Sequence, residues 1–106
     1  VPVVGLHITD ESGGRALAYS ADTAPCASIS RLAAGADVLL HEATAATNGH
    51  SSAAQAGEVA ARAQVGTLYL IHYDVHRPDE SKLLSEARNQ FSGPVKLARD
   101  LMRIEL

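Results

Sequence analysis

The stretch Arg15-Ala16-Leu17-Ala18-Tyr19-Ser20-Ala21-Asp22-Thr23 joins an apolar run to a polar one, and Pro25 follows two positions later. The apolar part has the length and composition of a short buried strand, which the polar residues and the proline end abruptly. Asp22 is therefore predicted to lie on the loop that leaves a sheet. Open α/β sheets bind their ligands at that edge.

Two later segments repeat this arrangement, because an apolar run leads directly into His41-Glu42 and another into His72. A further histidine, His50, lies in Asn48-Gly49-His50-Ser51-Ser52, where Gly49 permits a tight turn and either serine can cap the helix that follows. Strand ends and one loop thus supply carboxylates and imidazoles. These are the ligand types of a zinc or other transition-metal site.

Length and composition indicate one small soluble domain covering residues 1–106. Apolar residues make up 46% and charged residues 20% of the chain, which is typical of a globular protein and argues against disorder. The net charge of -3 gives no basic surface with which the chain itself would hold nucleic acid through phosphates. Any contact with RNA would have to be made elsewhere.

The cysteine content and the absence of long apolar runs favour a cytoplasmic protein. Cys26 is the single cysteine, so no intramolecular disulfide can form. No apolar run approaches the roughly 20 residues that span a bilayer, and residues 1–4 lack the features of a signal peptide, so no membrane contact is expected. The first residue is Val1 rather than methionine, which suggests a fragment or a processed chain.

The alternation of strand and helix patterns predicts an α/β fold with a mixed sheet, in the order ββαβαβαββ. The first two strands should form a hairpin around Asp10-Glu11-Ser12-Gly13-Gly14. The predicted strands cover residues 3–8, 15–19, 38–40, 68–71, 95–98 and 101–106, and the predicted helices cover 24–34, 51–63 and 81–91.

Four motifs occur in a fixed order: Ser20-Ala21-Asp22-Thr23, His41-Glu42-Ala43-Thr44, Gly49-His50-Ser51-Ser52 and Leu70-Ile71-His72-Tyr73. They resemble the Ser-Gly-Asp-Thr, His-Glu-Ala-Thr and Gly-His-Ser-Thr motifs and the last metal-binding histidine segment of metallo-β-lactamase-fold hydrolases. The resemblance is strongest to the ribonuclease Z group. It covers nearly the whole chain, and four ordered motifs are far more specific than any one.

The resemblance implies the C-terminal half of an αβ/βα sandwich whose complete form is a zinc-dependent phosphodiesterase, an endonuclease acting on RNA or a hydrolase of small phosphodiesters. It implies two Zn²⁺ ions, with Asp22 bridging them, His72 as a further metal ligand and His50 as the catalytic proton donor. His41 and Glu42 are expected beside the ligands, which they would orient without binding metal themselves.

The departures from the family pattern leave other activities open. Ala21 replaces a glycine, which is a mild change if the backbone φ there is ordinary, and Ala45 stands where a phenylalanine is common. Tyr73-Asp74-Val75-His76-Arg77 differs from the usual Ser-Pro-Arg-Tyr. The alternatives are a hydrolase of sulfate esters, lactones or cyclic nucleotides, and a half-fold module without metal or catalysis.

The upstream His-x-His-x-Asp-His motif of the family is absent, so these 106 residues alone are expected to be inactive. A half-sandwich would also expose one sheet face, which predicts a homo-oligomer or pairing with the missing N-terminal half.

Each candidate residue also has a purely structural interpretation. Asp22 could cap a helix or turn, His72 could be a core histidine, and His50 could be a loop residue bonded to Glu42 or to backbone. Cys26 is expected to be a small buried side chain. His7 is expected to have no chemical role, and His76 and Arg77 are expected to lie in a solvated loop.

Overall fold

The sheet places its five strands in sequence order, β1-β2-β3-β4-β5, in a computed structural model that describes residues 4–74 and 79–106. β1 pairs antiparallel with β2, and the remaining neighbours pair parallel. The predicted α/β fold with a mixed sheet is confirmed. The elements are β1 (Leu6–Thr9), β2 (Ala16–Tyr19), α1 (Ala27–Ala33), β3 (Val38–Glu42), α2 (Ala53–Ala63), β4 (Thr67–Ile71), α3 (Glu80–Arg88) and β5 (Val95–Leu97).

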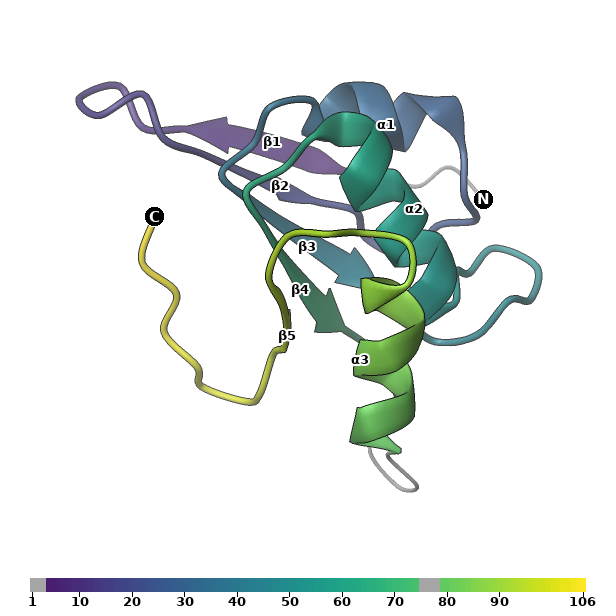
Figure 1. Cartoon of the computed structure of the whole chain (residues 1–106). Coiled ribbons are helices and arrows are strands. Elements are labelled where there is room, and N and C mark those ends of the chain that lie inside the picture. The colour runs from purple at the N-terminus through teal and green to yellow at the C-terminus, as the bar shows by residue number, and fades with distance from the viewer. Residues whose placement is uncertain (1–3, 75–78) are drawn as a thin grey trace.

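The three helices lie together on one face of the sheet (Figure 1). Strands that follow one another in a single direction, joined by crossovers of one hand, put every connecting helix on the same side. Under the helices the strands present small or branched apolar side chains. Ala18, Leu68 and Leu70 have no exposed surface there.

Helix α2 begins where the sequence predicts a cap. Gln55 N donates to Ser52 Oγ at 3.1 Å, and Ser52 N donates to Gln55 Oε1 at 2.8 Å, which completes a capping box. Further along the helix, a Cβ atom added to Gly57 would lie 2.5 Å from the carbonyl oxygen of Ala87. The missing side chain therefore lets α2 and α3 approach closely.

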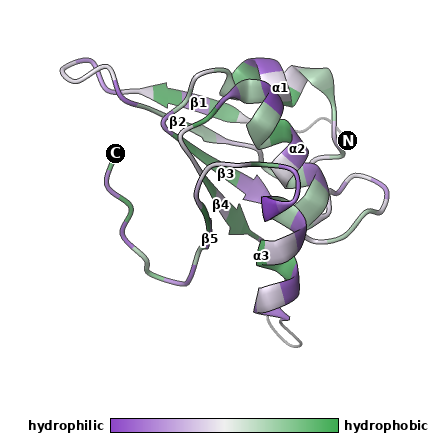
Figure 2. Cartoon of the chain, in the orientation of Figure 1, coloured by the Kyte–Doolittle hydropathy of each residue, from purple (hydrophilic) through white to green (hydrophobic). Residues whose placement is uncertain are grey.

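The face of the sheet opposite the helices exposes apolar side chains at β1. Leu6 and Ile8 of β1 are 49% and 55% exposed, and the β1–β2 register puts them on the same face as Tyr19 and Leu17. Figure 2 shows hydrophobic residues along the strands, whereas the end of β3 is hydrophilic. No helix in the described ranges is long and apolar enough to cross a membrane.

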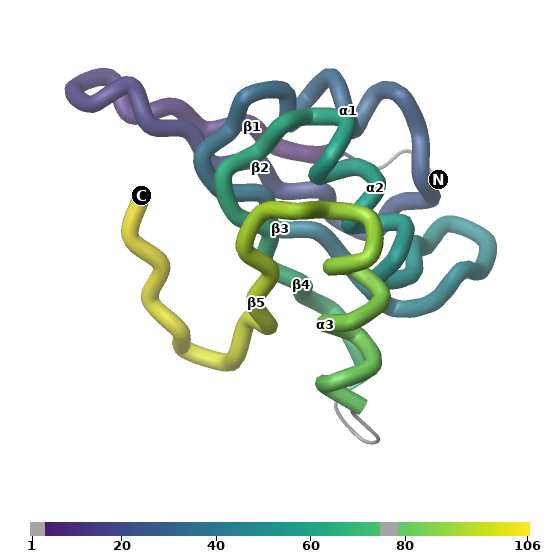
Figure 3. The backbone as a smooth tube through the Cα atoms, viewed as in Figure 1, coloured from purple at the N-terminus to yellow at the C-terminus, as the bar shows by residue number. Residues whose placement is uncertain are grey.

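The structure corrects two predicted elements. The first helix begins at Ala27 with Cys26 as its N-cap, so Pro25 precedes the helix instead of opening it. The predicted last strand, 101–106, does not form, and the described order is ββαβαβαβ. A strand requires a neighbour for its backbone hydrogen bonds, and side-chain alternation alone cannot supply one. Figure 3 shows this tail turning away from the sheet.

Candidate metal centre

The polar residues that follow β2, β3 and β4 meet at one edge of the sheet. Glu42 is the last residue of β3, His72 comes directly after β4, and Asp22 comes shortly after β2. Parallel strands bring their carboxyl ends to a common edge, as Figure 1 shows for β3 and β4. His50 joins them from the loop that precedes α2.

Four potential ligand atoms, one each from Asp22, Glu42, His50 and His72, all lie within 4.8 Å of one another. His72 Nδ1 lies 2.7 Å from Asp22 Oδ1, and both side chains are about half exposed. The predicted residues Asp22, His50 and His72 are therefore brought together. Their binding of metal stays a prediction.

The carboxylate of Glu42 is already used by the protein. Its Oε1 accepts hydrogen bonds from Thr23 N at 2.9 Å and Ser51 N at 3.1 Å, and its Oε2 accepts from Thr44 N at 3.1 Å. His50 Nδ1 lies 3.2 Å from the same Oε1. These contacts fit the predicted supporting role for Glu42. Asp22, His50 and His72 are left as the groups that can face an ion or a substrate.

Glu42 remains ionised although its side chain has no exposed surface. Burial by itself would raise the pKa of this carboxyl, but hydrogen bonds from Thr44 and Thr23 and the charge of the His50 imidazole together lower it. An anionic oxygen that faces His50 Nδ1 can only accept a hydrogen bond. The ring hydrogen is therefore assigned to Nδ1. The other nitrogen, Nε2, is then available to the site.

The ring of His72 is held by both Asp22 and Thr44. Thr44 Oγ1 lies 3.2 Å from His72 Nδ1 and donates to the His72 carbonyl oxygen at 2.9 Å. The backbone of His72 has a φ of +51°, in the left-handed region. Such a conformation costs about 1–2 kcal/mol for a residue with a Cβ, and strain of this kind concentrates at functional sites.

Ala21 also has a left-handed backbone, with a φ of +55°. The expectation that alanine is a mild replacement for glycine here depended on an ordinary φ, so that expectation is wrong. A residue with a Cβ atom is strained in this conformation, whereas glycine is not. Ala21 directly precedes Asp22, and this conformation sets the direction in which the chain presents the carboxylate.

His41 belongs to the interior and not to the cluster. Its side chain has no exposed surface, its Nδ1 lies 2.8 Å from the Glu42 carbonyl oxygen, and its Nε2 has no hydrogen-bond partner within the described residues. Burial lowers the pKa of the imidazole and outweighs the opposite influence of Glu42. His41 thus contacts the site through the Glu42 backbone, and its lowered pKa favours the neutral ring. A supporting role for it stays a prediction.

Three hydroxyl residues that were not predicted as site residues organise the site. Ser20 Oγ accepts from Glu42 N at 3.1 Å and donates to the Ala21 carbonyl, which ties the end of β2 to the end of β3. Ser51 Oγ donates to the Thr23 carbonyl at 2.5 Å, and Thr44 holds His72. In the sequence, the available indication of these roles was that the three residues lie inside the motifs.

Cys26 and His7 lie away from this chemistry. Cys26 is exposed at the N-cap position of α1, so the prediction of a buried thiol is wrong. His7 is exposed on β1 and its Nδ1 contacts the Leu32 carbonyl at 2.6 Å, which is a structural contact. His76 and Arg77 lie outside the described residues.

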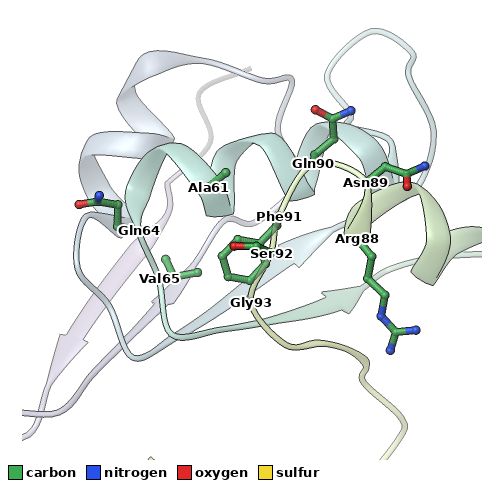
Figure 4. A pocket seen from close by; sticks show the side chains of 9 residues that line it. All are labelled: Ala61, Gln64, Val65, Arg88, Asn89, Gln90, Phe91, Ser92 and Gly93. Atoms are coloured by element: carbon green, nitrogen blue, oxygen red, sulfur yellow. The ribbon is translucent and has the colours of Figure 1, made fainter.

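Two hollows lie at opposite ends of β4. A cleft of about 680 Å³ begins at Ile71 and His72 and extends to Arg99 and Asp100, so it opens beside the metal-site candidates. A hollow of about 560 Å³ lies near Val65 and Phe91, with the lining shown in Figure 4. Only the first adjoins the cluster.

Sequence comparison relates the chain to named proteins. Residues 1–73 match the model of the β-lactamase superfamily domain. The chain is 39% identical to a ribonuclease Z of Thermoplasma acidophilum and 40% identical to one of Myxococcus xanthus. Each alignment covers 88% of this chain and 33% of the relative, so the chain spans about a third of these relatives' length.

Structure comparison agrees with this relationship. The metallo-β-lactamase fold protein YhfI from Bacillus subtilis superposes with a TM-score of 0.82 at 31% identity, over 90% of this chain and 41% of that one. The short form of human tRNase Z superposes with a TM-score of 0.69 over 95% of this chain and 37% of that one. Its 23% identity supports the common fold alone. The chain belongs to the metallo-β-lactamase superfamily.

Proposed function

We propose that the complete protein is a zinc-dependent hydrolase that cleaves phosphodiester bonds in RNA. The observation that carries this proposal is the convergence of Asp22, His50 and His72 at one sheet edge, with ligand atoms within 4.8 Å of one another. The similarity to proteins named ribonuclease Z supports the choice of bond and substrate.

The donor chemistry of the cluster fits zinc, which binds imidazole nitrogen and carboxylate oxygen. Asp22 and His72 would hold two Zn²⁺ ions together with residues that this chain does not contain. Bound zinc supplies a water of lowered pKa and neutralises negative charge on a phosphoryl group. Thr44 keeps His72 in place for this role through its contacts with the ring and with the carbonyl.

His50 is proposed to donate a proton to the leaving oxygen. Glu42 fixes the ring from the side of Nδ1, at 3.2 Å, through a carboxylate that has no exposed surface. Nε2 is then the atom that delivers the proton. General acid help of this kind contributes about 10²- to 10⁴-fold to a rate.

The open face of the sheet is proposed to contact the rest of the complete protein. Leu6 and Ile8 are exposed on this face beside the half-buried Leu17, and together they give an apolar surface that a partner could cover. Two sheets packed face to face would cover it. When that partner is absent, the same surface is expected to drive self-association of the 106-residue chain.

The proposal is tested with the full gene product and a panel of substrates. Precursor tRNA, an aryl phosphodiester, an aryl sulfate and a lactone are offered to the zinc-loaded protein. Cleavage of precursor tRNA and of the aryl phosphodiester, without cleavage of the others, is expected. Turnover of the sulfate ester or the lactone alone would refute the proposed reaction.

A further inference from the structure

The cleft that begins at His72 is large enough to hold part of a substrate. It has a volume of about 680 Å³ and is lined, among the described residues, by Ile71, His72, Tyr73, Ala98, Arg99 and Asp100. Binding sites for small molecules usually have volumes of about 300–1,000 Å³. The cleft therefore has room for the portion of a substrate that lies next to the reacting bond.

Sheet topology brings Arg99 to the same edge as the metal-site candidates. β5 runs parallel to β4, and Ala98 N donates to Leu70 O at 3.0 Å. Arg99 therefore comes shortly after the carboxyl end of β5, as His72 comes after that of β4. Tyr73 connects the two segments, because its hydroxyl donates to the Ala98 carbonyl at 2.6 Å and so fixes the ring in the wall of the cleft.

The guanidinium of Arg99 is anchored by Glu80, the first residue of α3. Arg99 Nη1 and Nη2 donate to the two carboxylate oxygens of Glu80 at 3.0 and 2.9 Å. Hydrogen bonds from Arg99 lower the pKa of Glu80, so the carboxylate stays charged. Figure 1 shows the start of α3 and the chain after β5 toward the same end of the molecule. A bidentate pair of this kind sets the plane of the guanidinium.

This pairing occupies the edge of the guanidinium and leaves its flat faces free. All of its N–H bonds lie in one plane, so a carboxylate that accepts two of them adds nothing above or below that plane. The Arg99 side chain is 58% exposed. Flat guanidinium faces stack on aromatic rings and on nucleobases.

The charges at this end of the cleft favour a neutral ring over a phosphate. Glu80 neutralises the guanidinium, and Asp100 adds a second carboxylate among the described residues. Ile71, Ala98 and the ring of Tyr73 contribute apolar surface to the wall. An aromatic base with N–H donors at its edge suits apolar walls, a stacking face and a carboxylate acceptor.

We propose that this cleft binds the nucleobase next to the scissile phosphodiester, and that Arg99 is the residue on which the base stacks. The inference rests on the proposed function, in which the reacting phosphate binds beside Asp22 and His72. The phosphate at the metal and the base in the cleft are then parts of one nucleotide. Glu80 is a positioning residue, since it acts through Arg99.

Calorimetric titration of the zinc-loaded full gene product tests the proposal without any need for catalysis. The probes are adenosine 5′-phosphate and adenosine 3′-phosphate, each compared with the ribose phosphate that lacks the base. At least one adenosine phosphate is expected to bind about 5- to 100-fold more tightly than its base-free partner, which is the range that stacking of one base provides.

Arg99→Ala is expected to remove this difference in affinity. Arg99→Lys should remove it too, because lysine keeps the charge that pairs with Glu80 but has no flat face. The matched control is Arg62→Ala, which removes an exposed arginine paired with Glu58 on α2 and should keep the difference. Urea unfolding of each variant separates a loss of binding from a loss of stability.

A preference for the base that survives Arg99→Ala would overturn the proposal. A preference that Arg99→Lys retains would show that the contact depends on charge, and would overturn it as well. Equal affinities for nucleotide and ribose phosphate in the wild type, or no binding of either, would have the same consequence. A preference that depends on Arg99 in a protein that cleaves no RNA would refute the proposed function alone.

Discussion

His50 Nδ1 lies 3.2 Å from Oε1 of Glu42, a carboxylate whose side chain has no exposed surface. The same oxygen accepts backbone N–H groups from Thr23 and Ser51, so it cannot turn away from the ring. This relationship explains how a histidine on a loop can be held as firmly as one on a strand. It also distinguishes the proposed role of His50 from that of Asp22 and His72, the two residues proposed to bind metal.

His50→Ala is expected to retain zinc and to lower the cleavage rate by about 10²- to 10⁴-fold. Aryl phosphodiesters with good leaving groups need little protonation, so their cleavage should suffer much less than that of poor leaving groups. Rates are measured across a series of leaving groups, with zinc content as the control. Equal losses across the series would refute the proton-donor role.

Glu42→Gln is expected to reduce the rate by about 10- to 100-fold, because the buried carboxylate that orients the His50 ring is lost. Rates of this variant are measured across the same series of leaving groups, with zinc content as the control. Poor leaving groups should lose more rate than good ones, because a misplaced imidazole delivers its proton less efficiently. An unchanged rate on poor leaving groups would contradict the coupling of these two residues.

Ala21→Gly is expected to stabilise the protein by about 1 kcal/mol, because glycine adopts the observed φ of +55° without strain. Leu101→Gly should act in the same direction, since Leu101 has a φ of +61° and a fully exposed side chain. Urea unfolding gives the free energies. Ala18→Gly, at a buried strand position, serves as the control and should destabilise.

The free energy of unfolding should fall as the pH decreases from about 7 to 5. Burial lowers the pKa of His41 from 6.5, so the unfolded chain takes up a proton in this range that the folded chain refuses. His41→Gln should flatten this part of the stability profile. His7→Gln, which changes an exposed histidine, should leave it in place. An unchanged slope in the His41 variant would refute the account of a buried neutral ring.

The site was predictable from sequence to the extent that strand order determines it. Asp22, Glu42 and His72 follow apolar runs, and parallel pairing brings such ends to one edge. Ser52 likewise caps α2 as its position indicates. These features depend on local pattern and on one general rule of sheet topology.

Other features depend on contacts that a single sequence does not display. The left-handed backbone of Ala21 reflects the geometry of the turn, and alanine at that position gives no sign of it. The roles of Ser20 and Thr44 depend on hydrogen bonds across strands. The last predicted strand failed because residues 101–106 have the right alternation and no neighbour in the described chain.

The zinc content of an Asp22→Ala variant of the full gene product tests the central claim most directly. Asp22 is expected to hold metal, so elemental analysis should find less zinc per chain than in the wild type, with a parallel loss of phosphodiesterase activity and with folding retained by circular dichroism. Asp10→Ala is the matched control, because Asp10 is an exposed carboxylate in the β1–β2 turn whose hydrogen bonds go to Ser12. It should keep the wild-type zinc content. Two equivalents of zinc in a folded Asp22→Ala protein would show that Asp22 is only a turn residue and would contradict the account.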